Sequence, residues 1–164
     1  MSAASWAPNG LSFVTSALEK ASSICHWSVE PSDFGANLHT IGGGFRAQDC
    51  AISPDGQRLV VVDSEKHLYV FNFQTYEKEY SQAFPSRLTC VTVTRDSRHM
   101  LVNLSSGEIQ LLEIETGDPV RTFDGQEQGN YIIRSCFGGA AENFVLSGSE
   151  GEPDSVCLNY CLRY

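Results

Sequence analysis

The chain repeats a short β-strand pattern four times, and this repeat limits the folds open to it more than any other feature. An apolar strand, a polar turn and a second apolar strand recur from Phe13, Leu59 and Met100, and a partial copy starts at Phe144. The starting residues are 46, 41 and 44 residues apart. Units that repeat at such a period bury their apolar faces against one another. Helical periodicity is nearly absent, so the chain is predicted to be all-β.

Turn residues recur in phase with these strands. Asn9 and Gly10 close the first turn, and Asp55 and Gly56 close the second. The preceding proline presets φ, and Asn-Gly or Asp-Gly tolerates positive φ, so both segments are predicted to be tight turns. Degenerate copies of the turn are expected at 94–97 and 138–142. Further short strands are expected at 3–6, 38–41, 49–52, 78–84, 89–93, 119–123 and 132–137.

Each repeat thus comprises four strands in about 40–45 residues, which is the period of a β-propeller blade. We expect four blades, the last one incomplete, at 2–44, 45–85, 86–126 and 127–164. Neighbouring blades should cover the middle strands on both faces, because the apolar residues of these strands stand at successive positions. The expected inter-blade core comprises Phe13, Val61, Tyr69, Phe71, Val102, Leu111, Phe144 and Leu146.

The repeat resembles the WD-repeat β-propeller. In that motif a tryptophan ends the third strand of a blade, and here Trp27, Phe71 and Leu112 hold the position. The SPDG turn at 53–56 and the SGSE segment at 147–150 are also typical of the motif, whereas no copy has an intact Trp-Asp pair. The resemblance implies an all-β WD-repeat propeller, partial or open because its last blade is incomplete.

A narrower resemblance, to the WD repeat-containing protein 26 family, covers most of the chain. It rests on the segments at 46–73 and 119–126, and above all on the run YIIRSCFGG at 131–139 followed by SGSE at 147–150. That family supplies the WD-repeat subunit of the CTLH, or GID, ubiquitin ligase. The resemblance therefore implies a non-catalytic scaffold of the cytoplasm and nucleus. The implied partners are other subunits of the ligase and the substrates that it recruits.

The chain departs from this family in two respects. Family members carry LisH and CTLH helical regions before the propeller and have more than four blades, whereas this chain starts at a blade. Residues 152–164 also leave the family pattern, although 155–160 could form a strand with Tyr160 near the expected aromatic position. An unclosed ring leaves an apolar blade face and sheet edges open. The chain alone is therefore expected to self-associate through the open propeller edge, or to be poorly soluble or marginally stable.

Composition and cysteine usage narrow the function further. The formal charge of -9 argues against a broad surface for nucleic acid or anionic membranes, since such surfaces need clustered cations. No apolar stretch approaches the ~20 residues that span a bilayer. The first ten residues do not resemble a secretion signal, so reduced thiols are expected. Cys50, Cys90 and Cys136 fall at matching places in the first strand of three repeats, where we expect buried packing residues.

No cofactor, metal or catalytic site is predicted from the residues. Cys157 and Cys161 lack the second pair of ligands that a zinc site needs. The glycines at 42–44 lack the remainder of a phosphate-binding loop, and no set of side chains supports acid–base catalysis. Two alternatives stand beside the ligase scaffold. One is a WD-repeat scaffold of another assembly, in trafficking or RNA processing, and the other is a propeller-type enzyme.

Overall fold

A computed structural model describes residues 2–41, 44–129, 131–151 and 160–161. These residues form four antiparallel sheets and no helix, so the all-β prediction is confirmed. The first sheet contains β1 (Ala3–Trp6), β2 (Ser12–Ser16), β3 (Ile24–Ser28) and β4 (Asn37–Ile41). The second contains β5 (Ala47–Ile52), β6 (Arg58–Asp63), β7 (His67–Asn72) and β8 (Lys78–Ala83). The third contains β9 (Leu88–Val93), β10 (His99–Leu104), β11 (Ile109–Glu113) and β12 (Pro119–Phe123), and the fourth β13 (Ser135–Gly138), β14 (Phe144–Ser147) and β15 (Tyr160–Cys161).

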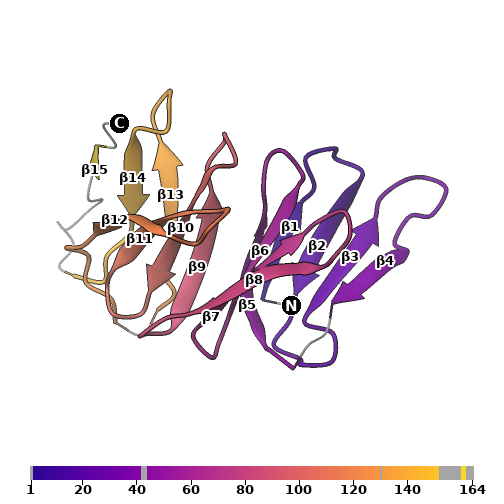
Figure 1. Cartoon of the computed structure of the whole chain (residues 1–164), viewed down its shortest axis with the longest axis horizontal. Coiled ribbons are helices and arrows are strands. Elements are labelled where there is room, and N and C mark those ends of the chain that lie inside the picture. The colour runs from indigo at the N-terminus through magenta and orange to yellow at the C-terminus, as the bar shows by residue number, and fades with distance from the viewer. Residues whose placement is uncertain (1, 42–43, 130, 152–159, 162–164) are drawn as a thin grey trace.

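The strands of each sheet pair in chain order, as a meander, and the sheets follow one another like the leaves of a fan (Figure 1). Such radial repetition of small antiparallel sheets is the architecture of a propeller. Among the described residues, one face of the first sheet and one face of the fourth have no neighbouring sheet, so the fan is open (Figure 1). The expected fold class, a partial WD-type propeller, is confirmed. The blade limits taken from the sequence stay a prediction.

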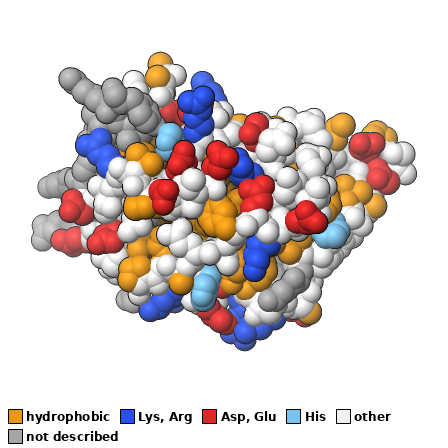
Figure 2. All heavy atoms as spheres, viewed as in Figure 1, with side chains coloured by type: hydrophobic (Ala, Val, Ile, Leu, Met, Phe, Trp, Pro, Cys, Tyr) orange, Lys and Arg blue, Asp and Glu red, His pale blue; other side chains and the backbone are white. Residues whose placement is uncertain are grey.

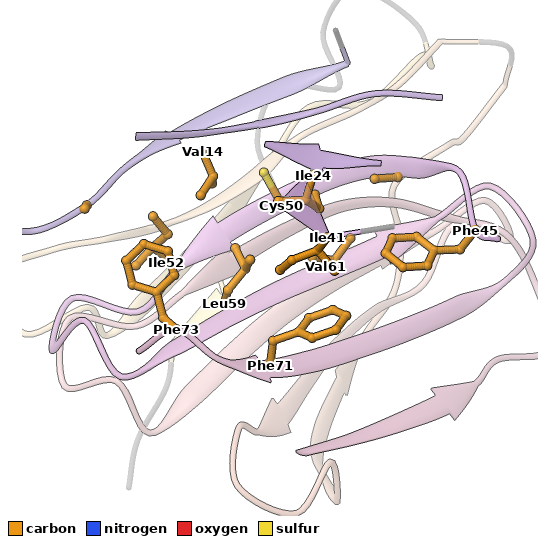
Figure 3. Packing of buried hydrophobic residues seen from close by; sticks show 12 residues of the cluster. Val14, Ile24, Ile41, Phe45, Cys50, Ile52, Leu59, Val61, Phe71 and Phe73 are labelled. Carbon is orange, nitrogen blue, oxygen red and sulfur yellow. The ribbon is translucent and has the colours of Figure 1, made fainter. Parts of the chain in front are cut away.

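The core lies between the sheets. In the first junction, Leu59, Val61 and Phe71 of the second sheet face Val14 and Ile24 of the first (Figure 3). The four residues 59–62 of β6 are all fully buried, because alternate side chains of this strand enter the junctions on its two sides. Burial on both faces explains why the strand is continuously apolar.

Three expected core residues do not lie in the inter-sheet core. Phe13 and Leu146 are half-buried, and Phe144 is 40% exposed. Phe13 lies on the uncovered face of the first sheet, and Phe144 and Leu146 lie on the uncovered face of the fourth. The prediction assumed a blade on both sides of every sheet, and the two outermost faces do not meet that condition.

The fourth sheet is also shifted relative to the predicted repeat. Its first strand was expected at 132–137 but spans Ser135–Gly138, because the preceding residues bind the third sheet instead of a partner strand. The backbone carbonyl of Ile133, for example, accepts a hydrogen bond from Asn103 Nδ2 at 3.2 Å. Val145, and not Phe144, points into the junction with the third sheet. Of the strand expected at 155–160, only Tyr160 is described, in β15.

This shift corrects the prediction that three cysteines share one repeat position. Cys50 and Cys90 are buried, whereas Cys136 is exposed. Cys50 pairs with Val61, which lies two residues after Leu59 in β6. Cys90 pairs with Asn103, which lies three residues after Met100, the residue of β10 that corresponds to Leu59. Cys136 pairs with Leu146, one residue beyond Val145. Since side chains alternate along a strand, Cys136 points to the uncovered face of its sheet.

Candidate protein-interaction surface

The turns between the first two strands of each sheet lie along one rim of the molecule. In the first two turns, Gly10 and Gly56 both have a φ of 71°, a left-handed conformation that a glycine adopts without a Cβ clash. The Asn9 and Asp55 side chains each accept a hydrogen bond at 2.9 Å from the backbone N–H two residues later. These four residues, chosen from the sequence as turn formers, therefore occupy equivalent places in two neighbouring turns.

The third and fourth turns place a residue other than glycine where Gly56 stands in the second. Ser97 and Glu142 stand at the position of Gly56, with φ of 61° and 55°. Their side chains reach the preceding turn: the Asp55 N–H donates to Ser97 Oγ at 3.0 Å, and the Arg95 N–H donates to Glu142 Oε2 at 2.8 Å. Side chains thus link the second, third and fourth turns of the rim. A rim fixed in this way can present side chains to a partner at little entropic cost.

Two depressions lie between these turns. The first, of about 360 Å³, separates the third and fourth turns, and the second, of about 330 Å³, separates the second and third. Four carboxylates and two guanidinium groups line the second depression, from Asp55, Asp96, Glu113, Glu115, Arg58 and Arg98. Acidic side chains also surround a hydrophobic area near the middle of the face in Figure 2. The second depression therefore offers polar, mainly acidic contacts.

The residues at the WD tryptophan position have different environments in the three sheets. Phe71 is buried against the first sheet, and Leu112 is buried against the second. Trp27 is half-buried on the uncovered face of the first sheet, where its indole N–H donates to Thr15 Oγ1 at 2.9 Å. The same repeat position therefore seals two junctions and, in the first sheet, contributes to an open surface.

The innermost strand of the second sheet holds a buried aspartate whose ion-pair partner, an arginine, is largely exposed, and the sequence did not reveal this pair. Asp49 of β5 is almost fully buried, and its carboxylate accepts hydrogen bonds from the Arg134 guanidinium at 3.2 and 3.3 Å and from the Val91 N–H at 3.1 Å. One carboxylate thereby connects the second sheet, the third sheet and the segment leading into the fourth. The signal available in the sequence was an aspartate directly before the apolar residues 50–52 of the same strand, since a buried charge needs partners.

The thiols beside this pair are not activated. Burial, with a further contribution from Asp49, raises the pKa of Cys50 to about 12 and that of Cys90 to about 11. Both side chains therefore remain protonated thiols at neutral pH, and a thiol is a much weaker nucleophile than a thiolate. Their role in the described structure is packing.

The segment between the third and fourth sheets places two hydrophobic side chains in solvent. Tyr131 is 76% exposed, and Ile132 is 49% exposed. The backbone beneath them is fixed, because Glu150 Oε1 accepts hydrogen bonds from the N–H groups of Gly129 and Tyr131 at 2.8 and 2.9 Å. Exposed aromatic residues on a fixed backbone are typical of protein-binding hot spots. We call residues 131–134 the linker loop.

The described residues contain no group of three or more His, Cys, Asp or Glu side chains placed to hold a metal ion. Cys157 lies outside the described residues, and so does the Cys161 side chain. No helix that could cross a membrane occurs in the part of the chain that the structure describes.

Similar proteins support the fold and the narrower resemblance, although no protein-family model matches the chain. The chain is 33% identical over 154 residues to GID complex subunit 7 of Schizosaccharomyces pombe, covering 90% of this chain and 29% of that protein. It is 32% identical over 151 residues to a WD repeat-containing protein 26 homolog of Arabidopsis thaliana, covering 88% of this chain and 24% of that protein. The crystal structure of the RRP9 WD40 repeats superposes with a TM-score of 0.71 at 18% identity, over 97% of this chain and 50% of that one.

The resemblance to the WD repeat-containing protein 26 family is thereby confirmed. The chain spans less than a third of the length of these two relatives and half of the solved WD40 chain. The solved structure, at 18% identity, supports the fold alone.

Proposed function

We propose that this chain is a non-catalytic interaction scaffold, forming part of a subunit of a GID/CTLH-type E3 ubiquitin ligase. The observation that carries the proposal is the 33% identity to GID complex subunit 7 over nine-tenths of the chain. In this role the chain organises the complex or recruits substrates, in the cytoplasm and nucleus. Its partners are other ligase subunits and their substrates. The linked rim of turns and the linker loop supply fixed surfaces of the kind that such a role needs.

The proposal is tested by affinity purification of the tagged chain from its source cells, followed by mass spectrometry. CTLH-type subunits should be recovered with the wild-type chain. Replacing Tyr131 and Ile132 together by alanine should lower their recovery at least about tenfold, because exposed aromatic anchors dominate binding energy. Phe34→Ala is the matched control, since Phe34 is equally exposed but lies on the first sheet's outer loop.

Recovery of no CTLH-type subunit would contradict the ligase assignment. Recovery of a trafficking or RNA-processing assembly instead would favour the alternative WD-repeat scaffold. Unchanged recovery with the double variant would leave the ligase assignment in place but exclude the linker loop as the binding surface.

A further inference from the structure

Three arginines stand at corresponding places in three successive sheets, directly before the first strand of each. Arg46 precedes β5, Arg87 precedes β9 and Arg134 precedes β13, and all three are exposed. The first strands of these sheets lie side by side, β5 against β9 and β9 against β13. Because sheets pack face to face about 10 Å apart, the arginine backbones follow one another at roughly that spacing.

The backbones of the first two arginines are held by the same hydrogen bond. The Arg46 carbonyl accepts from the Ser64 N–H at 3.0 Å, and the Arg87 carbonyl accepts from the Ser105 N–H at 2.7 Å. The two arginines and the two serines are each separated by the same repeat of 41 residues. Both guanidinium groups are therefore presented from a fixed backbone, which lowers the entropic cost of binding a ligand.

The positive charges of the three arginines are compensated to different extents. The Arg134 guanidinium binds the buried Asp49 carboxylate at 3.2 Å, so its charge has a partner inside the protein. The Arg46 and Arg87 side chains form no ion pair within the part of the chain that the structure describes. These two arginines are therefore the members of the set that can accept an external anion.

Lys66 adds a further positive charge beside Arg87. It lies in the turn between β6 and β7, and its ammonium donates to the Pro85 carbonyl at 2.9 Å, two residues before Arg87. The acidic residue of the same turn, Glu65, pairs instead with Lys20 at 3.2 Å. Lys66 thus has a carbonyl for a partner and keeps its charge uncompensated.

We propose that Arg46, Lys66 and Arg87 bind a short acidic peptide segment of a partner protein, which names the chemistry of one partner for the scaffold role on which this inference rests. A guanidinium offers two parallel N–H donors that match a carboxylate. An extended peptide repeats its side chains on one face about every 7 Å, so successive carboxylates can reach the two arginines. A long polyanion such as nucleic acid fits less well, because the formal charge of -9 repels it outside this site.

The experiment is fluorescence anisotropy of the purified chain with a labelled octaglutamate peptide. The wild type should bind this peptide at least about tenfold more tightly than octaglutamine, and added salt should weaken the binding. Arg46→Ala and Arg87→Ala should each raise the dissociation constant about fivefold. Arg95→Ala is the matched control, since it removes an exposed arginine from the opposite end of β9, about 20 Å from Arg87, and should change nothing.

Several results would overturn the proposal. One is a wild type that does not prefer octaglutamate, and another is an equal loss of affinity in Arg95→Ala, because binding would then follow net charge alone. Tighter binding of a single-stranded oligonucleotide of the same length would assign the site to nucleic acid instead. Arg87→Lys keeps the charge and should bind more tightly than Arg87→Ala, and circular dichroism melts show whether each variant is folded.

This measurement separates the acidic-peptide site from the ligase assignment, because it uses the purified chain and a synthetic peptide. Failure to bind octaglutamate would remove the site and leave the ligase assignment to the affinity purification. Failure to recover CTLH-type subunits would remove the ligase assignment and leave the peptide measurement unchanged.

Discussion

At the scale of single residues, the most consequential side chain is Asp49. Its carboxylate has lost nearly all contact with water and depends on Arg134 and the Val91 N–H for compensation. The guanidinium is different, because the Arg134 side chain is 60% exposed and can return to solvent. Leaving Asp49 unpaired therefore costs more folding free energy than leaving Arg134 unpaired.

We expect Arg134→Ala to lower the free energy of unfolding by about 1–3 kcal/mol, because it leaves the buried carboxylate without its counter-ion. Asp49→Asn should cost less, since the amide oxygen can still accept from the Val91 N–H. In the Arg134→Ala background, Asn at position 49 should be neutral or stabilising, because it removes an unpaired buried charge. Urea denaturation of the two single variants and the double variant measures this coupling. Additive effects would show that the ion pair is energetically unimportant.

At the scale of elements, the strands were predictable where turn chemistry marks their ends. The second to fourth strands of the first three sheets lie within two residues of the expected limits, because short polar turns separate them and Asn-Gly or Asp-Gly precedes two of the second strands. The register of β13 and β14 was not predictable to the residue. It depends on where the linker loop binds the third sheet, and those contacts join residues about 30 positions apart.

The structure also packs a side chain from a turn of the second sheet against two strands of the first. Tyr76, in the turn between β7 and β8, stacks on His39 of β4 with a centroid distance of 3.9 Å. Its hydroxyl forms a hydrogen bond of 2.8 Å with His26 Nδ1 of β3. His26 and His39 stand opposite one another in the pairing of β3 with β4, and the Phe73 ring lies 4.9 Å from the His26 ring. This cluster closes the outer end of the first junction.

We expect the cluster to make the chain less stable in mild acid. Burial, and then the nearby His39, lowers the pKa of His26 below its usual 6.5 in the folded state. The folded state therefore binds a proton at this site less readily than the unfolded chain. Stability from the neutral imidazole is complete above pH ~6.5 and declines as the pH falls from there toward the lowered pKa. Urea midpoints measured across this interval should fall more for the wild type than for His26→Gln.

Tyr76→Phe provides the matched comparison for this pH dependence. It removes the hydroxyl and about 1 kcal/mol of hydrogen-bond stabilisation but keeps the buried imidazole. Tyr76→Phe should be less stable than the wild type at every pH, and it should still lose stability in mild acid. Equal pH profiles for the wild type and His26→Gln would contradict the assignment. Asp96, whose hydrogen bonds lower its pKa, acts in a separate range below pH ~3.8 and does not interfere.

At the scale of the whole molecule, stability is expected to vary along the fan. In repeat architectures each unit is stabilised mainly by its nearest neighbours. The second and third sheets are covered on both faces, whereas the fourth is covered on one and its β14 contributes only Val145 to the buried core. The fold class was predictable because period and pattern mark each sheet. Which faces remain open depends on the number of sheets in the ring.

Native-state hydrogen exchange should reveal this gradient. At concentrations low enough to keep the chain monomeric, amides of β14 should exchange at least about tenfold faster than those of β10, its counterpart in the third sheet. The amides of β6 should be among the slowest, since this strand has buried neighbours on both sides. Equal protection of β14 and β10 in the monomer would show that the sheets open together.

The side-chain links between turns have a consequence for the order in which the protein matures during synthesis. The backbone N–H of Asp55 obtains its acceptor from Ser97, and that of Arg95 obtains its acceptor from Glu142. The second and third turns are therefore each completed by a residue that the ribosome adds more than 40 positions later. Domains acquire structure from the N-terminus as they emerge. The rim turn of a newly made sheet would consequently lack one of its hydrogen bonds until the next sheet has been translated and has docked beside it.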